Sequence, residues 1–289
     1  MRRAGKRADR REERGRREQW LLLAGRSRQP GLSPPDVSRL VTLQPPDGAF
    51  WADPFLWSRD GRHYLFFEEY PYATARGRIS VLELDREAHP VGAAVTVIEE
   101  PHHLSYPFVF EAGGELYMVP EKAQTRRVDL YRCVAFPTRW ELVKTLIEGV
   151  TIADATLFEL AGLWWLFGAV KERGLHLNES LCAFYADSPL STEWKAHPTN
   201  PLVRDFSRGR PGGRIFRDGE GRLLRPAQDC VRRYGYGLSL SEITAISTEH
   251  YGERLLWRMN GEDAGGWRGM HHMDWHEGLL VLDVQRLVT

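Results

Sequence analysis

The sequence predicts an all-β protein, a five-bladed β-propeller with four-stranded antiparallel blades. A hairpin with a similar sequence pattern recurs five times at spacings of about 50 to 60 residues, and further strand segments lie between the copies. No segment of the body carries apolar residues with helical spacing over three turns without an interrupting Pro or Gly. Radial repetition of small sheets leaves only short, protected edges, so about 240 residues of such repeats fit this architecture.

Each copy reads as a strand, a tight turn containing glycine, and a second strand. The copies occupy residues 53–69, 106–121, 154–168, 213–226 and 271–283. Strand segments between them lie at 77–84, 127–134, 180–185 and 235–240. The rival fold is a two-sheet sandwich, which does not require a recurring hairpin, and the recurrence therefore favours the propeller.

The chain divides into a short N-terminal tail and one large domain. Residues 1–19 contain nine Arg or Lys and four Asp or Glu, with little to pack against a core, and we expect them to form a basic, disordered tail. Residues 20–289 form the propeller domain. We expect Trp20 to Leu23 to supply a strand that completes the last blade and closes the ring, and the proline-rich segment 29–48 to be an entry segment.

The composition gives expectations about the partners of the protein and its location in the cell. The charges balance overall, with 39 basic and 39 acidic residues, and the acids interspersed in the tail argue against nucleic acid as a partner. No apolar run reaches the ~18 residues of a membrane span. Cys133, Cys182 and Cys230 are widely separated, which argues against a zinc site or a disulfide framework and fits a cytoplasmic protein.

The innermost strand of a propeller blade runs along the central channel, so the residue that opens it faces a shared funnel. These openers are Asp53, Tyr106, Asp154, a position near Arg210 or Arg214, and His271 or His272. One Asp could simply begin a strand as a turn residue. Two at equivalent repeat positions favour a functional site, because buried carboxylates are rare without partners.

Polar groups also end the second strands of these hairpins, and two carboxylates beside a sugar ring can divide acid and base roles. The candidates there are Glu68, Glu69, Glu121, Gln228 and Asp229. Arginines gather in the fourth repeat, where they could bind an anionic sugar or phosphate or could balance the acids of the funnel. The remaining substrate-binding candidates are Trp51, His103, Arg233 and Tyr234. Adjacent histidines on a strand point to opposite faces, so we expect no metal and no cofactor.

Several ordered motifs resemble one known family. They are FWADPFL (50–56) with YLFFEE (64–69), HLSYPFVF (103–110) with MVPE (118–121), DATLF (154–158) with WWLF (164–167), RPAQDC (225–230) with RRYGY (232–236), and GMH (269–271). Over about residues 20 to 289 the chain is similar to the N-terminal domain of plant glucosamine inositolphosphorylceramide transferases and its stand-alone bacterial relatives. In the plant proteins a separate glycosyltransferase domain follows.

The chain is more distantly similar to the five-bladed glycoside hydrolases that include invertases, levansucrases, arabinanases and xylosidases. That likeness implies that Asp53 is the base or nucleophile of blade one. The chain departs from the pattern in blade two, which opens with Tyr106 instead of Asp, and in blade three, which opens with Asp154 instead of Glu. Asp154 is then a second carboxylate, and Glu121 is the candidate acid.

Three functions follow as hypotheses. The first is a carbohydrate-active propeller that hydrolyses or transfers a glycosyl unit. The second is a non-catalytic module that binds a carbohydrate or glycoconjugate and serves a separate glycosyltransferase partner. The third, a protein-interaction propeller, predicts a flat hydrophobic rim in place of a polar funnel.

Overall fold

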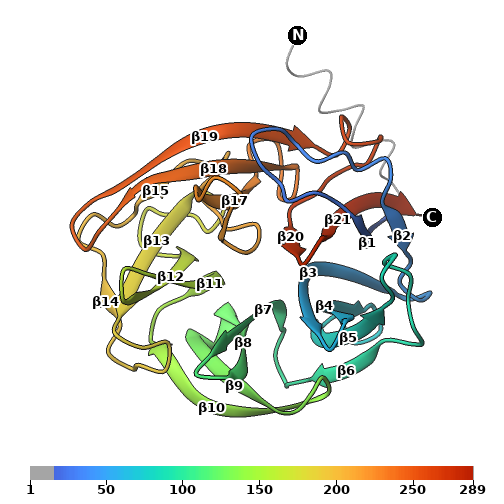
Figure 1. Cartoon of the computed structure of the whole chain (residues 1–289), viewed down its shortest axis with the longest axis horizontal. Coiled ribbons are helices and arrows are strands. Elements are labelled where there is room, and N and C mark those ends of the chain that lie inside the picture. Colours follow the sequence, from blue (N-terminus) through green and yellow to red (C-terminus); the bar gives the residue numbers. More distant parts are fainter. Residues whose placement is uncertain (1–15, 289) are drawn as a thin grey trace.

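The computed structural model describes residues 16–288 and is a five-bladed β-propeller, as the repeats predict (Figure 1). Its single helical element is a 3-10 turn, η1 (Ala123–Thr125). Blade 1 contains β3 (Ala49–Arg59), β4 (Arg62–Pro71), β5 (Arg78–Leu84) and β6 (Val95–Ile98). Blade 2 contains β7 (Ser105–Ala112), β8 (Glu115–Glu121), β9 (Arg127–Ala135) and β10 (Arg139–Glu148).

The other three blades are also antiparallel. Blade 3 contains β11 (Ile152–Leu160), β12 (Leu163–Val170), β13 (Ser180–Ala186), β14 (Lys195–Ala196) and the added β15 (Val203–Arg204). Blade 4 contains β16 (Phe216–Arg217), β17 (Leu223–Asp229), β18 (Gly237–Ile246) and β19 (Tyr251–Asn260). Blade 5 contains β20 (Met273–His276), β21 (Leu279–Val288), β1 (Arg17–Arg26) and β2 (Val41–Leu43).

Blade 5 joins the two ends of the chain. Strand β1 pairs with β21 from Arg17 opposite Val288 to Arg26 opposite Leu279, and this confirms the predicted closing strand. The strand begins at Arg17, three residues before the expected boundary of the domain. The short β2 lies within the segment 29–48, for which the sequence predicted no strand. Residues 1–15, most of the predicted tail, lie outside the described residues.

The core lies between blades, because each sheet is apolar on both faces and packs on its neighbours. One cluster joins blades 1, 2 and 3 through residues such as Phe55, Val109 and Leu157. Another joins blade 5 to blade 1 through Leu22, Val281 and others. The described residues contain no helix long and apolar enough to cross a membrane.

The inner strands of blades 1 to 3 share an irregularity at the predicted opening residue. Asp53, Tyr106 and Asp154 have φ angles of 52°, 43° and 57°, in the left-handed region that non-glycine residues rarely occupy. The pairing register shifts at the same points, so each residue sits in a β-bulge. Bulges bend a strand and re-aim its side chains, and they often lie next to functional sites.

Candidate functional site

Hydrogen bonds from the bulged residues connect the blades around the axis. Asp283 Oδ2 accepts the backbone N–H of Asp53 at 3.1 Å, and Asp53 Oδ2 accepts that of Tyr106 at 3.2 Å. The Tyr106 hydroxyl lies 2.8 Å from Thr156 Oγ1 and accepts the N–H of Gly213 at 3.1 Å. These contacts run from blade 5 through blades 1, 2 and 3 to the start of blade 4. They hold the openers in place against their backbone strain.

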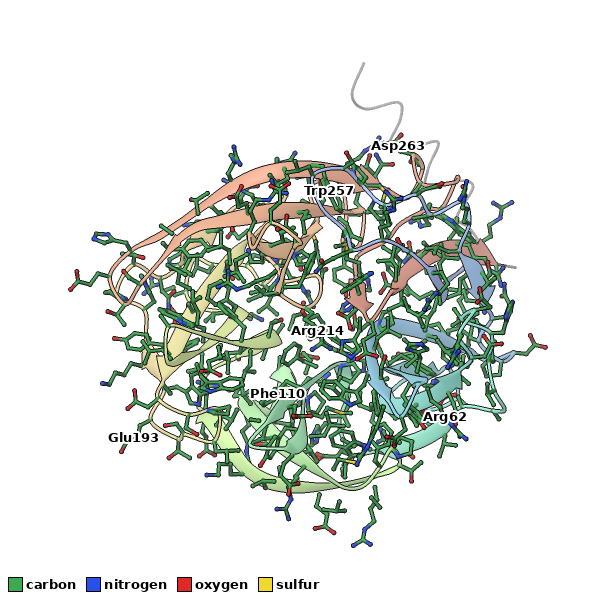
Figure 2. The ribbon with its side chains drawn as sticks, in the orientation of Figure 1. Arg62, Phe110, Glu193, Arg214, Trp257 and Asp263 are labelled. Carbon is green, nitrogen blue, oxygen red and sulfur yellow. The ribbon has the colours of Figure 1, made fainter. Side chains whose placement is uncertain are left out.

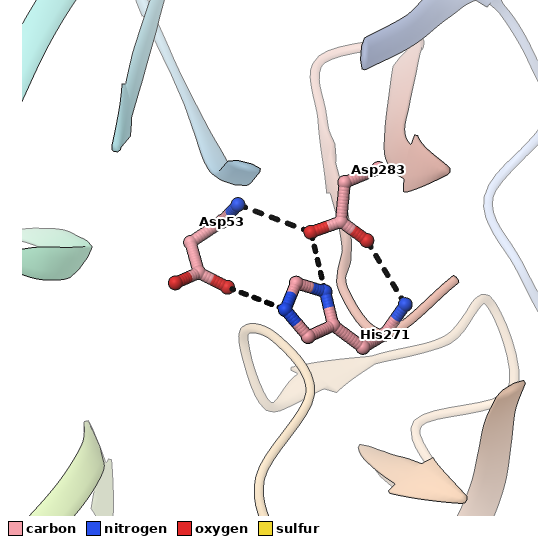
Figure 3. A group of neighbouring side chains, drawn as sticks. All are labelled: Asp53, His271 and Asp283. Atoms are coloured by element: carbon pink, nitrogen blue, oxygen red, sulfur yellow. Dashed lines mark hydrogen bonds and ion pairs between the residues drawn. The ribbon is translucent and has the colours of Figure 1, made fainter. Parts of the chain in front are cut away.

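Asp53, His271 and Asp283 form the most compact polar group at this centre (Figure 3). His271 Nδ1 lies 2.6 Å from Asp283 Oδ2, and His271 Nε2 lies 3.7 Å from Asp53 Oδ1. Asp283 Oδ1 accepts the N–H groups of His271 and His272, both at 2.9 Å. One ligand atom from each of the three lies within 4.8 Å of the others, a set that could hold a cation, although Asp283 already accepts four polar contacts.

Burial dominates the protonation of this group. It raises the pKa of Asp53 to about 7, an effect that the charge of His271 opposes and those of Asp154 and Asp283 reinforce. Burial alone would lower the pKa of His271, but the Asp283 carboxylate outweighs it and the pKa is raised. Conversely, His271 holds the pKa of the buried Asp283 below its usual value. Burial lowers the pKa of His272 to about 3, which leaves it neutral.

Asp154 is held by two side chains of blade 4. Arg210 donates from Nε and Nη2 at 2.5 and 3.3 Å, and Gln228 Nε2 donates at 3.0 Å. Arg210 and Asp154 therefore form an ion pair of the kind that the sequence predicted for balancing the acids, and both side chains are largely buried. The charge of Asp154 raises the pKa of both Asp53 and Glu121, so the three predicted carboxyls act on a common region.

Glu68 and Glu121 complete this carboxyl cluster. Both lie at the ends of second strands, in β4 and β8. Burial raises the pKa of each, most strongly for Glu68, where the charges of Asp53 and Glu121 add to the effect. His103 Nε2 lies 3.4 Å from Glu68 Oε1.

Aromatic rings cover one side of the cluster. Trp20, from the closing strand β1, stacks on His271 with ring centroids 4.1 Å apart. Tyr234 meets the same imidazole edge-on at 5.2 Å, and the Arg210 guanidinium lies 5.0 Å from the Tyr234 ring. Tyr234 is 43% exposed.

Some predicted site residues lie elsewhere. Glu69 lies on the opposite face of β4 from Glu68 and bonds Arg78 and Ser80. Trp51 pairs with Glu69 in register and packs against Phe67 in the core between blades 5 and 1.

Two predicted residues of blade 4 are also outside the cluster. Asp229 accepts the N–H of Val231 at 3.0 Å, and Arg258 and Asp205 are the charges that act on it. Arg233 bonds the backbone carbonyl of Arg268 and lies over the Tyr236 ring.

Arg214 lies near the centre of the ring (Figure 2). It pairs with Asp274 at 3.0 Å and donates to the carbonyls of Val109 and Leu56. Leu56 follows Asp53 by three residues, roughly 10 Å along a strand that rises ~3.3 Å per residue. Arg214 thus ties blades 5, 2 and 1 to blade 4 below the carboxyl cluster.

The sequence left Asp283 and Asp274 out of the site and named both Glu68 and Glu69 as strand-end candidates. Strand alternation puts Glu68 and Glu69 on opposite faces of β4, and Glu68 pairs with Ala52, directly before the bulge at Asp53, whereas Glu69 pairs with Trp51. Asp283 ends an apolar run of the fifth repeat, as Glu121 ends that of the second. Nothing local shows that it would receive the N–H groups of three residues.

The family can now be assigned from sequence. The profile described as "Glucosamine inositolphosphorylceramide transferase 1, N-terminal" matches residues 38–284. The chain belongs to this family. It is 38% identical over 269 residues to glucosamine inositolphosphorylceramide transferase 1 of Oryza sativa subsp. japonica, and 36% identical over 236 residues to that of Arabidopsis thaliana.

The matched regions cover 88% and 78% of this chain but only 36% and 30% of those relatives. This glucosamine inositolphosphorylceramide transferase N-terminal domain thus spans about a third of their length.

Solved structures with the same fold are glycosidases of low sequence identity. The α-L-arabinofuranosidase of Podospora anserina superposes with a TM-score of 0.60 at 10% identity, covering 93% of this chain and 97% of that one. The family 62 α-L-arabinofuranosidase of Coprinopsis cinerea gives 0.59 at 12% identity, covering 92% and 97%. A family 43 protein from the xyloglucan locus of Bacteroides ovatus gives 0.55 at 14% identity, covering 75% and 43%. These likenesses establish the shared propeller fold.

Proposed function

We propose that this propeller acts on a glycosidic bond of a carbohydrate or glycoconjugate, either hydrolysing it or transferring a glycosyl unit. The observation that carries the proposal is Asp53, a carboxyl at the centre of the ring whose pKa is raised to about 7 by burial. Groups that exchange protons efficiently have pKa values near the working pH. Further carboxyls from the same and the next two blades surround it.

In this mechanism Asp53 is the base or nucleophile and Asp154 is the second carboxylate. Asp154 is paired with Arg210 and accepts a hydrogen bond from Gln228. Its charge adds to the effect of burial, which raises the pKa of Asp53. A second carboxyl must protonate the departing oxygen. Glu121, the predicted acid, which is half-buried, and Glu68, which is buried, are the two candidates.

A second candidate function is a non-catalytic module that binds a glycan and serves a separate glycosyltransferase. The hydrogen bonding of Asp154 favours it, because three donor atoms of Arg210 and Gln228 leave this carboxylate little freedom to react. The relatives, which are about three times as long, are named as transferases, and this also fits a role beside a transferase.

Replacing Asp53 by Asn separates the two candidates. The probes are 4-nitrophenyl glycosides of arabinofuranose, xylose, galactose and glucosamine, with binding measured by calorimetry. Glucosamine is taken from the name of the plant relatives, and the other three sugars from solved propellers of the same fold, which include an arabinofuranosidase, a β-xylosidase and a β-1,3-galactanase. If the propeller is catalytic, Asp53→Asn lowers turnover by roughly 10²-fold or more and changes the dissociation constant little.

The matched control is Asp60→Asn, an exposed turn residue of the same hairpin, which should leave turnover unchanged. If no glycoside is turned over and Asp53→Asn changes only affinity, the binding module is the correct account.

A further inference from the structure

We propose that Glu68 is the proton donor of this site, in the role that the sequence analysis assigned to Glu121. The inference rests on the proposed function and assigns one of its two open roles. It departs from the blade-three acid of the similar hydrolases, because Asp154 occupies that position here and is bound by Arg210.

Glu68 lies on the strand that pairs with the strand of Asp53. In the β3–β4 ladder it is opposite Ala52, directly before Asp53 and its bulge. It is 6% exposed, and burial raises its pKa, a rise that the charges of Asp53, Glu121 and Asp154 reinforce.

The surroundings of Glu68 favour the protonated carboxyl. Oε1 is enclosed without a hydrogen bond, and no N–H or O–H among residues 16–288 donates to either oxygen. The adjacent atom is His103 Nε2 at 3.4 Å. His103 Nδ1 accepts the N–H of Gly77 at 3.0 Å, and burial lowers the pKa of His103, so the neutral ring carries its proton on Nε2.

Gly77 is needed for this close packing. A Cβ added there would lie 2.7 Å from Glu68 Oε1 and 2.4 Å from the carbonyl of Leu104. The carboxyl of Glu68 is thus enclosed by backbone and a neutral imidazole. A buried carboxyl without donors is more stable neutral than ionised.

Glu121 differs in its hydrogen bonds. Its carboxylate accepts Ser105 Oγ at 2.9 Å and the N–H of Ala123 at 2.7 Å. Donors to a carboxylate favour the ionised form. Of the two candidates, Glu68 is therefore the one equipped to hold a proton for donation.

The step balances without a further reactant. Glu68 gives its proton to the glycosidic oxygen as the bond from the anomeric carbon to that oxygen breaks. Water, or an acceptor hydroxyl, forms the new bond to the anomeric carbon and loses a proton to Asp53. Proton exchange with solvent then restores Asp53 as the carboxylate and Glu68 as the acid, while the Nε2–H of His103 faces the transient Glu68 carboxylate.

Leaving-group dependence tests the assignment. A 2,4-dinitrophenyl group departs without protonation, whereas a phenyl group needs an acid. For the sugar turned over in the 4-nitrophenyl panel, Glu68→Gln should lower turnover of the phenyl glycoside by roughly 10² to 10⁴-fold and change that of the dinitrophenyl glycoside little. Asp53→Asn should impair both substrates. The control Glu111→Gln, at an exposed position of β7, should alter neither.

Equal losses on both substrates, or none, in Glu68→Gln would overturn the acid assignment while Asp53→Asn still supports the proposed function. Absence of turnover on every glycoside would overturn the proposed function and the acid role with it. Infrared difference spectra give a readout without turnover: Glu68→Gln should remove a protonated-carboxyl band at neutral pH that Glu111→Gln retains. An ionised Glu68 at that pH contradicts the inference, and thermal unfolding of each variant identifies a folding defect.

Discussion

At the scale of single residues, Asp53 combines a left-handed φ of 52° with an exposed fraction of 5%. Either feature alone is unfavourable for an aspartate, and both persist because the surrounding contacts hold them. Asp283 fixes its N–H, and its own Oδ2 fixes that of Tyr106. The charge state of Asp53 then depends on its neighbours, and His271 is the neighbouring charge that most favours the ionised carboxylate.

Replacing His271 by Gln should therefore move the pH profile of the propeller. His271 lowers the pKa of Asp53, so its loss raises that pKa above about 7. A base must be ionised to act, and the ascending limb of kcat/KM against pH should shift to higher pH. The control His250→Gln is exposed and should leave the limb in place. A downward shift would contradict the electrostatic account of Asp53.

At the scale of elements, β1 both closes the ring and helps to build the site. It pairs with β21 on one side and β2 on the other, and its Trp20 stacks on His271. The closing strand carries seven consecutive buried residues from Gln19 to Gly25, of which Leu21 and Leu23 pack in one cluster and Leu22 and Ala24 in another. Its contribution is thus mainly burial of apolar surface.

Truncating Leu22 to Ala should lower the free energy of unfolding by about 2 to 5 kcal/mol, because the side chain is fully buried and leaves a cavity. Thr42→Ala, at an exposed position of β2 in the same blade, should change it by less than about 0.5 kcal/mol. Urea denaturation measures both. Similar values for the two variants would show that blade 5 does not close the ring in solution.

At the scale of the whole molecule, Arg214 is the contact that joins blades across the axis. It is paired with the fully buried Asp274 and lies over the Phe55 and Phe108 rings. Burial raises the pKa of Asp274, and the Arg214 charge opposes that rise. Removing one partner of such a buried ion pair lowers stability strongly, because the remaining charge is left buried and unpaired.

Arg214→Met should therefore lower the free energy of unfolding by about 3 to 5 kcal/mol. The double variant Arg214→Met, Asp274→Leu should lose less than the sum of the two single changes, because neither charge remains unpaired. Denaturant titrations of the four proteins give the coupling directly. Strict additivity would mean that the two residues do not interact.

Much of the fold could be predicted from the five hairpins, because their apolar strands and glycine turns are local patterns. The closing strand was predicted from its apolar run. Strand β2 was missed because its three residues, within a proline-rich segment, are too few to show an alternating pattern. For the site, Asp53 and Asp154 were identified from their equivalent places in the repeats. Glu68 and Glu69 could not be told apart, since a one-residue choice in strand phase decides which side chain faces the axis.

The order of residues along the chain determined the five repeats, the strand that closes them and the family to which they belong, because these depend on short-range periodicity and on motif identity. Only the tertiary structure decided which polar groups meet at the axis and in what protonation state. Asp283 and Asp53 are separated by 230 residues and become hydrogen-bonded only when β21 and β3 come together. The pKa values of these groups follow from burial and neighbouring charges, and both exist only once the ring has closed.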